Sequence, residues 1–117
     1  VGKAIRELHR NAVNHGDLST NNILIDKERN PILIDLGLSS REYDLEGFGI
    51  DLHVLHEILR ASHPEVKGAM DLVLKGYVAL DEELGKPQPA PGGMPPDATE
   101  VLKRLEQIMM RVRYHGG

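Results

Sequence analysis

The sequence contains no cysteine, which excludes a disulfide framework, a thiolate nucleophile and a cysteine-based metal site. Aromatic residues make up only 3% of the chain, so its core must be mainly aliphatic. No apolar run approaches the ~20 residues that a membrane span requires. Positive charge is not in excess either, because 14 Lys and Arg stand against 18 Asp and Glu. The resulting net charge of −4 argues against nonspecific binding to a nucleic-acid backbone. These absences favour a soluble intracellular domain with no membrane association.

What is present suffices for one small domain. Hydrophobic residues make up 40% of 117 residues, enough to form a single core. Residues 1–13 carry apolar side chains at helical spacing from the very first turn. The chain begins with Val1 rather than methionine, and nothing precedes this helix to cap it. We therefore expect a segment cut from a longer protein.

Two short apolar runs, 23–25 and 32–34, are separated by a polar, turn-prone stretch and predict a β-hairpin. Both runs are continuous rather than alternating, so we expect the hairpin to be covered on both faces.

The rest of the chain is expected to be mainly helical. Helical periodicity predicts one helix over 50–61 and another over about 64–80, with Gly68 and Gly76 weakening the second. Residues 82–97 contain five of the seven prolines and are expected to form a flexible loop. Asp97 and Glu100 have the spacing of a capping box, which predicts a final helix after it. The expected fold class is therefore α+β, mostly helical with one small hairpin.

Three oxygen-bearing side chains stand where the sequence predicts chemistry. Asp17 and Asn22 are five residues apart in a polar loop, and Asp35 follows the second predicted strand. The hairpin can fold back and bring Asp35 beside the other two. Carboxylate and amide oxygens suit Mg²⁺ completed by substrate phosphates, and a further carboxylate can accept a proton from an attacking hydroxyl. The alternative is that Asp17 and Asn22 only form turns and Asp35 only ends a strand.

The order of these residues matches the signature of protein kinases, with H-x-D, an asparagine five residues beyond the aspartate, a hairpin and D-x-G. More specifically, residues 15–22, HGDLSTNN, resemble the small atypical kinases of the KEOPS tRNA-modification complex. The resemblance continues through IDLGLS at 34–39, where Leu36 replaces a phenylalanine, and through GIDLHVL at 49–55. It is close from Val1 to about Tyr77 and loose over the last helix.

The resemblance assigns roles to five residues of this chain. It implies that Asp17 is the catalytic base and that Asn22 and Asp35 bind the metal and, through it, the nucleotide phosphates. It implies that Asp51, at the start of a helix, hydrogen-bonds the catalytic loop and holds its shape. An ordinary acid stabilised by the helix dipole is the alternative for Asp51. His15 is expected to be a packed, hydrogen-bonded residue that supports the loop rather than a base.

The same resemblance implies a serine/threonine kinase or ATPase that uses ATP and Mg²⁺ and supports threonylcarbamoyladenosine formation on tRNA. Its expected partners are the threonylcarbamoyltransferase subunit and other KEOPS subunits, with tRNA reached through the complex. The implied location is the cytoplasm, and also the nucleus in a eukaryote.

Residues 1–117 are expected to be only the C-lobe of such a kinase, because no glycine-rich loop or phosphate-binding lysine of an N-lobe is present. The isolated chain is accordingly expected to bind ATP·Mg²⁺ weakly and to have little or no activity. Two other functions stay open. One is a non-catalytic interaction module that binds the transferase subunit, and the other is a small-molecule phosphotransferase of the aminoglycoside type.

Overall fold

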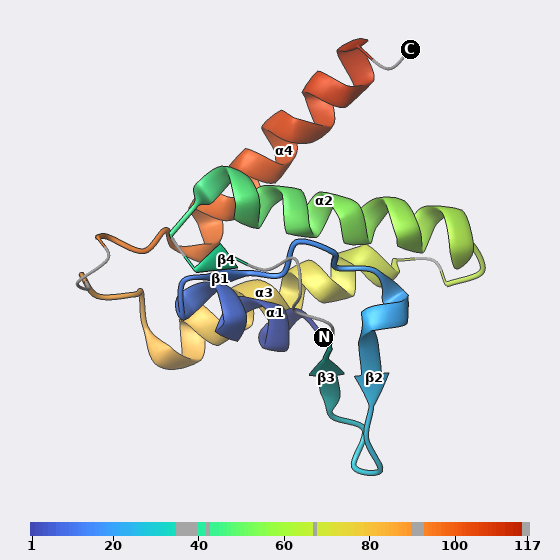
Figure 1. Ribbon diagram of the computed structural model, residues 1–117, viewed down its shortest axis with the longest axis horizontal. Helices are drawn as coiled ribbons and strands as arrows, with labels where there is room; N and C mark the ends of the chain where they lie inside the picture. The colour runs from blue at the N-terminus through green and yellow to red at the C-terminus, as the bar shows by residue number, and fades with distance from the viewer. Residues whose placement is uncertain (35–39, 42, 67, 90–92, 116–117) are drawn as a thin grey trace.

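The computed structural model describes residues 1–34, 40–41, 43–66, 68–89 and 93–115. The described chain is α+β, as predicted, with four α-helices and two pairs of short antiparallel strands (Figure 1). The helices are α1 (Gly2–Arg10), α2 (Leu45–Ser62), α3 (Ala69–Leu84) and α4 (Ala98–His115). The short elements are β1 (Val13–Asn14), the 3-10 turn η1 (Thr20–Asn22), β2 (Ile23–Ile25), β3 (Pro31–Leu33) and β4 (Ser40–Arg41). Among the described residues, none of the helices combines the length and apolar composition that crossing a bilayer requires.

The core lies where the helices meet. Helix α1 packs against α3, and α2 packs against α4. The buried hydrophobic cluster draws on all four helices and on one loop residue, Leu18; its members are Ile5, Leu18, Phe48, Leu52, Leu55, Tyr77, Ala98, Val101 and Leu105. Leu18 lies in the 15–22 segment, so the predicted catalytic loop is attached directly to the core.

Helix α2 begins at Leu45, five residues earlier than predicted. Gly47 and Gly49 precede the predicted start, but both lie inside the helix and are buried. A Cβ on Gly49 would come within 2.8 Å of Ile108 Cδ1 and 3.1 Å of Arg104 Cγ on α4. Gly49 therefore permits close packing of α2 against α4, whereas a Cβ on Gly47 would meet the side chains of Asn14 and Asp44.

The predicted boundaries of two other helices were wrong. Helix α1 ends at Arg10 rather than at residue 13, because Ala12 has a φ of 64° and leads the chain into β1. Helix α3 begins at Ala69 and continues to Leu84, into the segment expected to be a loop. Gly68 precedes this helix with a φ of 74°, a left-handed conformation that glycine adopts without steric cost, so it does not weaken the helix interior.

The start of α4 confirms the capping box. The backbone N–H of Glu100 donates to Asp97 Oδ1 at 2.8 Å, and the backbone N–H of Asp97 donates to Glu100 Oε1 at 3.4 Å. From there α4 extends past α2, and its C-terminal half projects from the helical body (Figure 1).

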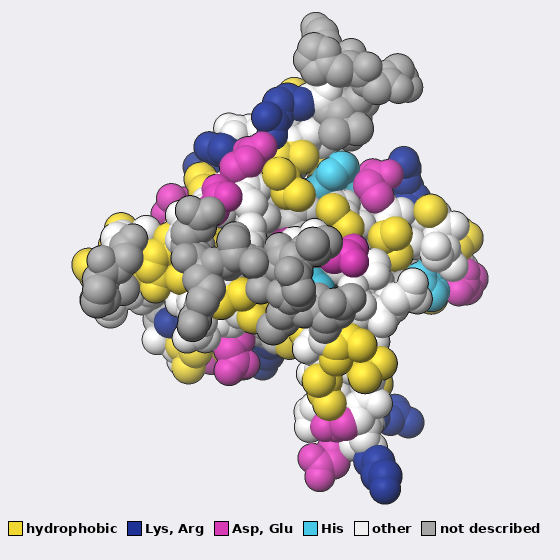
Figure 2. All heavy atoms as spheres, in the orientation of Figure 1, with side chains coloured by type: hydrophobic (Ala, Val, Ile, Leu, Met, Phe, Trp, Pro, Cys, Tyr) yellow, Lys and Arg dark blue, Asp and Glu magenta, His cyan; other side chains and the backbone are white. Residues whose placement is uncertain are grey.

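The hairpin forms as predicted in type but not in burial. Ile23 pairs with Leu33 and Ile25 with Pro31, so the second strand begins one residue earlier than expected. The expectation that both faces are covered was wrong, because Leu24, Ile25 and Ile32 are 49%, 58% and 46% exposed. Figure 2 shows these hydrophobic side chains on a hairpin that extends from the body, with charged side chains at its tip. A continuous apolar run does not guarantee burial of both faces, because Ile23 and Leu33 pack against the helical core while Leu24, Ile25 and Ile32 are exposed.

Candidate functional site

Asp17 and Asn22 lie together in the loop between β1 and β2. The Asn22 side-chain Nδ2 donates to the backbone carbonyl of Asp17 at 2.9 Å and to its carboxylate Oδ2 at 3.3 Å. Asn22 is 8% exposed, whereas Asp17 is half-buried. The two residues that the sequence placed five apart are thus joined by a double contact, with Asp17 still reachable from solvent.

His15 is fully buried and holds the loop through two side-chain hydrogen bonds. Its Nδ1 accepts a hydrogen bond from the backbone N–H of Asp17 at 3.1 Å, so Nε2 carries the proton and donates to the carbonyl of Ile34 at 2.7 Å. The predicted supporting position of His15 agrees with these contacts.

Ile34 is held by the loop through both of its backbone groups. In addition to the contact with His15, its N–H donates to the carbonyl of Asn22 at 2.9 Å. Asp35, the third predicted site residue, follows Ile34 in the chain but lies outside the described residues.

Asp51 anchors the loop to α2. Its carboxylate accepts hydrogen bonds from the backbone N–H of His15 at 2.7 Å and from that of Gly16 at 3.0 Å. Gly16 has a φ of 87°, which favours glycine at this position. Asp51 is only 2% exposed and lies in the second turn of a helix that begins at Leu45. The expectation that it starts the helix was therefore wrong, and a helix-dipole explanation does not apply.

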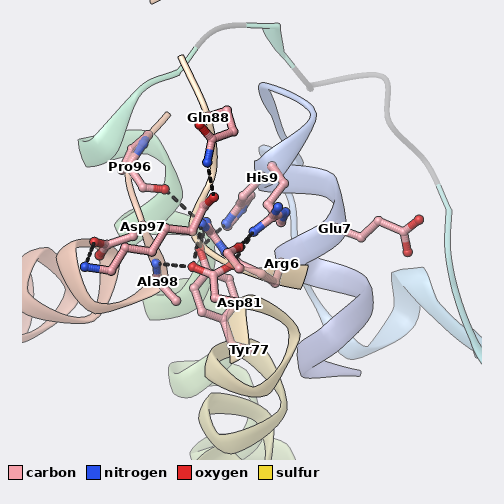
Figure 3. Close-up of polar contacts among 12 residues, drawn as sticks. Arg6, Glu7, His9, Tyr77, Asp81, Gln88, Pro96, Asp97 and Ala98 are labelled. Carbon is pink, nitrogen blue, oxygen red and sulfur yellow. Dashed lines mark hydrogen bonds and ion pairs between the residues drawn. The ribbon is translucent and has the colours of Figure 1, made fainter. Parts of the chain in front are cut away.

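Behind Asp51 lies a group of buried polar residues that the sequence did not predict. His9 donates from Nε2 to Asp51 Oδ2 at 2.9 Å, and its Nδ1 lies 2.7 Å from the Tyr77 hydroxyl. Arg6, fully buried, forms a two-point ion pair with Asp81 through Nε at 2.7 Å and Nη2 at 3.0 Å. Figure 3 shows Arg6, Tyr77 and Asp81 converging between α1 and α3. Arg6 and His9 are one helical turn apart on α1, and polar side chains at that spacing ordinarily indicate a solvent-facing stripe, so the sequence carried no signal for their burial.

Burial and ion pairing set the charges of this group. Burial lowers the pKa of His9 below its usual value of 6.5, although the hydrogen bond to Asp51 opposes the shift. Burial also raises the pKa of Tyr77, which keeps its hydroxyl protonated. Burial alone would raise the pKa of Asp81, but hydrogen bonds from Arg6 and from the backbone N–H of Ala98 leave it below its usual value. A neutral His9 thus lies between the Asp51 carboxylate and a protonated Tyr77.

The oxygen donors of the loop suit a hard cation. Asn22 uses its amide nitrogen toward Asp17, which leaves Oδ1 as an acceptor for another group. An amide oxygen and carboxylates are ligands that Mg²⁺ accepts. Within the described ranges, no group of three or more His, Asp or Glu side chains could hold a metal ion.

An apolar hollow of about 440 Å³ lies elsewhere in the molecule, among residues of α1, β2, α2 and α3. Its lining includes Gly2, Ile23, Leu59 and Val73 but neither Asp17 nor Asn22. The candidate site is therefore the loop and its anchors, not this hollow.

Residues 1–63 match the model of the lipopolysaccharide kinase (Kdo/WaaP) family. The chain belongs to this kinase family. The match covers α1, the 15–22 loop, the hairpin and all of α2, so it includes Asp17, Asn22, Asp35 and Asp51.

Curated relatives confirm the resemblance to KEOPS proteins. The chain is 33% identical over 114 residues to a "Probable bifunctional tRNA threonylcarbamoyladenosine biosynthesis protein" of Methanosarcina mazei. It is 32% identical to "EKC/KEOPS complex subunit BUD32" of Yarrowia lipolytica and 30% identical to "KEOPS complex subunit Bud32" of Pyrococcus abyssi. Each match covers 97% of this chain, which in turn spans 18%, 40% and 46% of these three relatives.

Proposed function

We propose that this chain carries the catalytic loop of an atypical serine/threonine kinase or ATPase that acts in KEOPS-dependent threonylcarbamoyladenosine modification of tRNA. The observation that carries the proposal is the contact of Asn22 Nδ2 with both the carbonyl and the carboxylate of Asp17, in a loop that the buried Asp51 holds. This arrangement keeps one half-buried carboxylate and one amide oxygen close together on a rigid support.

In the proposed reaction, Asp17 orients the attacking hydroxyl or water and accepts its proton. Asn22, through Oδ1, and Asp35 would hold Mg²⁺, which would supply positive charge to the phosphates of ATP. The attachment of Ile34 to His15 and Asn22 supports this assignment, because Asp35 is the next residue in the chain.

The names of the relatives support the biological assignment. Proteins named as KEOPS subunits and as threonylcarbamoyladenosine biosynthesis proteins match almost the whole chain. We therefore propose the threonylcarbamoyltransferase subunit and other KEOPS subunits as partners, with tRNA reached through the complex. This role corresponds to the cytoplasm, and to the nucleus as well in a eukaryote.

The test uses the full-length gene product with ATP and Mg²⁺. Asp17→Asn keeps the size of the side chain and removes the base, so we expect ATP turnover to fall by at least about 100-fold. The matched control is Asp71→Asn, an exposed carboxylate on α3, which should leave turnover unchanged. Turnover that survives Asp17→Asn would contradict the catalytic assignment. Retained binding to the transferase subunit would then favour a non-catalytic interaction module.

A further inference from the structure

A continuous chain of polar contacts connects the start of α4 to the catalytic loop. Asp81 Oδ2 accepts from the backbone N–H of Ala98 at 2.9 Å, and Arg6 Nη2 donates to the carbonyl of Pro96 at 2.9 Å (Figure 3). Arg6 pairs with Asp81 and reaches the Tyr77 hydroxyl from Nη1 at 3.5 Å. The contacts continue from the Tyr77 hydroxyl to His9 Nδ1 and from His9 Nε2 to the Asp51 carboxylate.

When His9 is neutral, only one placement of the protons gives each of these hydrogen bonds one donor and one acceptor. The Asp51 carboxylate can only accept, so His9 must carry its proton on Nε2. Its Nδ1 must then accept, which makes the Tyr77 hydroxyl the donor. The oxygen of Tyr77 in turn accepts from Arg6, whose guanidinium can only donate. Two groups therefore favour the tautomer of His9 that donates to Asp51: the carboxylate, which can only accept, and the Tyr77 hydroxyl, which donates to Nδ1 while its oxygen accepts from Arg6.

We propose that Tyr77 and Arg6 are positioning residues for the catalytic loop, acting through His9 and Asp51. Asp51 holds the backbone N–H groups of His15 and Gly16, immediately before Asp17. If His9 adopted the other tautomer, an unprotonated Nε2 would face the Asp51 carboxylate, and the two acceptors would repel. Asp51 would then shift and release the backbone it holds. The inference rests on the proposed catalytic role of Asp17.

The same series of contacts links the first turn of α4 to the site indirectly. Arg6 and Asp81 each bind a backbone group of the 96–98 segment, where α4 begins. Displacement of that segment would remove the contacts that orient Arg6 and Asp81. Arg6 would then no longer be held in position to donate to the Tyr77 hydroxyl. The start of α4 and the position of the catalytic loop are thereby linked through buried side chains.

The decisive variant is Tyr77→Phe in the full-length gene product. It keeps the ring and its edge contact with His9 and removes only the hydroxyl. We expect kcat for ATP turnover to fall about tenfold, with KM for ATP changed by less than about twofold. Imidazole ¹⁵N shifts of His9 should show loss of the pure Nε2–H tautomer. Tyr43→Phe is the matched control, since Tyr43 is a half-buried tyrosine outside this chain of contacts, and it should change neither measurement.

A pair of variants at His9 distinguishes loss of the hydrogen bond to Asp51 from unfolding of the protein. His9→Gln can donate an amide N–H toward Asp51 without help from Tyr77, whereas His9→Leu cannot. We expect kcat of His9→Gln to exceed that of His9→Leu by about tenfold and to be insensitive to an added Tyr77→Phe.

The outcomes separate this inference from the proposed function. If Asp17→Asn abolishes turnover while Tyr77→Phe changes neither kcat nor the His9 tautomer, the positioning role is overturned and the catalytic assignment stands. Equal kcat for His9→Gln and His9→Leu would overturn it as well. If Asp17→Asn retains turnover, the catalytic assignment fails, and the His9 tautomer in Tyr77→Phe still decides whether Tyr77 controls the contact with Asp51.

Discussion

The imidazole of His9 lies flat against the ring of Phe48, with ring centroids 4.3 Å apart and planes inclined by 15°. Both side chains are buried, and the imidazole edge is occupied by Asp51 and Tyr77. Burial lowers the pKa of His9, the hydrogen bond and charge of Asp51 raise it, and the positive charge of Arg6 lowers it further. Burial outweighs Asp51, so the folded protein keeps His9 neutral at neutral pH.

His9 should therefore make stability depend on pH. Its folded pKa is lowered, so the unfolded chain binds the extra proton first as pH falls below about 6.5. The free energy of unfolding should decrease between pH 6.5 and 5, with a slope of up to about 1.4 kcal/mol per pH unit from this residue. Urea unfolding at several pH values measures this slope. His9→Gln, although less stable overall, should show a flatter slope, and parallel slopes would contradict the assignment.

Asp51→Asn should destabilise the fold by about 3 kcal/mol. The carboxylate accepts hydrogen bonds from three donors, namely the backbone N–H groups of His15 and Gly16 and the imidazole of His9. An amide has one oxygen, and its NH₂ group would face a donor. Chemical denaturation measures the loss, with Glu82→Gln as an exposed control on α3 that should change stability by less than about 0.5 kcal/mol. A small effect at Asp51 would mean that the loop does not depend on it.

The Arg6–Asp81 pair should show strong coupling in a double-mutant cycle. Its side chains are 0% and 10% exposed, so removing either one leaves a poorly solvated charge. We expect Arg6→Met and Asp81→Asn each to cost about 3 kcal/mol, with a coupling energy of about 1–3 kcal/mol.

Lys3 and Glu83 provide the matched control, because they join the same two helices and are 52% and 53% exposed. Their coupling should stay below about 1 kcal/mol and decrease further in high salt. Equal coupling energies for the two pairs would show that burial does not strengthen the Arg6–Asp81 contact.

Two glycines at the α1–α3 crossing should respond to alanine in opposite ways. A Cβ on Gly2 would collide with the carbonyl oxygen of Val73 and lie 2.7 Å from the backbone nitrogen of Tyr77. Gly2→Ala should therefore cost at least about 2 kcal/mol. A Cβ on Gly76 has its nearest neighbours at 3.4 Å, so the gain in helix propensity of up to about 1 kcal/mol should offset any crowding. Thermal unfolding of both variants measures the contrast, and a comparable loss in both would show that the crossing tolerates no added volume.

Short-range sequence patterns predicted the elements that depend on residues close together in the sequence. The capping box at Asp97 and Glu100 and the two strands of the hairpin depend on neighbouring residues and could be predicted from the sequence. The contact between Asp17 and Asn22 spans only five residues, so their spacing was informative. The spatial relation of Asp51 to the loop came from the family resemblance, since no local rule connects residues 36 positions apart.

Other features could not be predicted because they depend on tertiary contacts. Gly49 indicates a turn by propensity, yet it lies inside a helix, where the packing of α2 against α4 leaves no room for a Cβ. Arg6 and His9 are polar and predict solvent exposure, yet each finds a buried partner on another helix. The exposure of Ile25 was missed for the opposite reason, since apolar character alone predicts burial.

The exposed hairpin has a consequence for handling the protein. In the described residues, β2 and β3 form a two-stranded sheet, so each strand has an outer edge without a partner strand. An apolar strand with such an edge is a template for self-association into larger sheets. The turn at 26–29 carries four charged residues in succession, and these repel or solvate an approaching copy. Asp26 also holds the turn, because its Oδ1 accepts hydrogen bonds from the backbone N–H groups of Glu28 and Asn30. Colloidal solubility should therefore depend on this turn, and neutralising the three charged residues that follow Asp26 should lower it while leaving the hairpin intact.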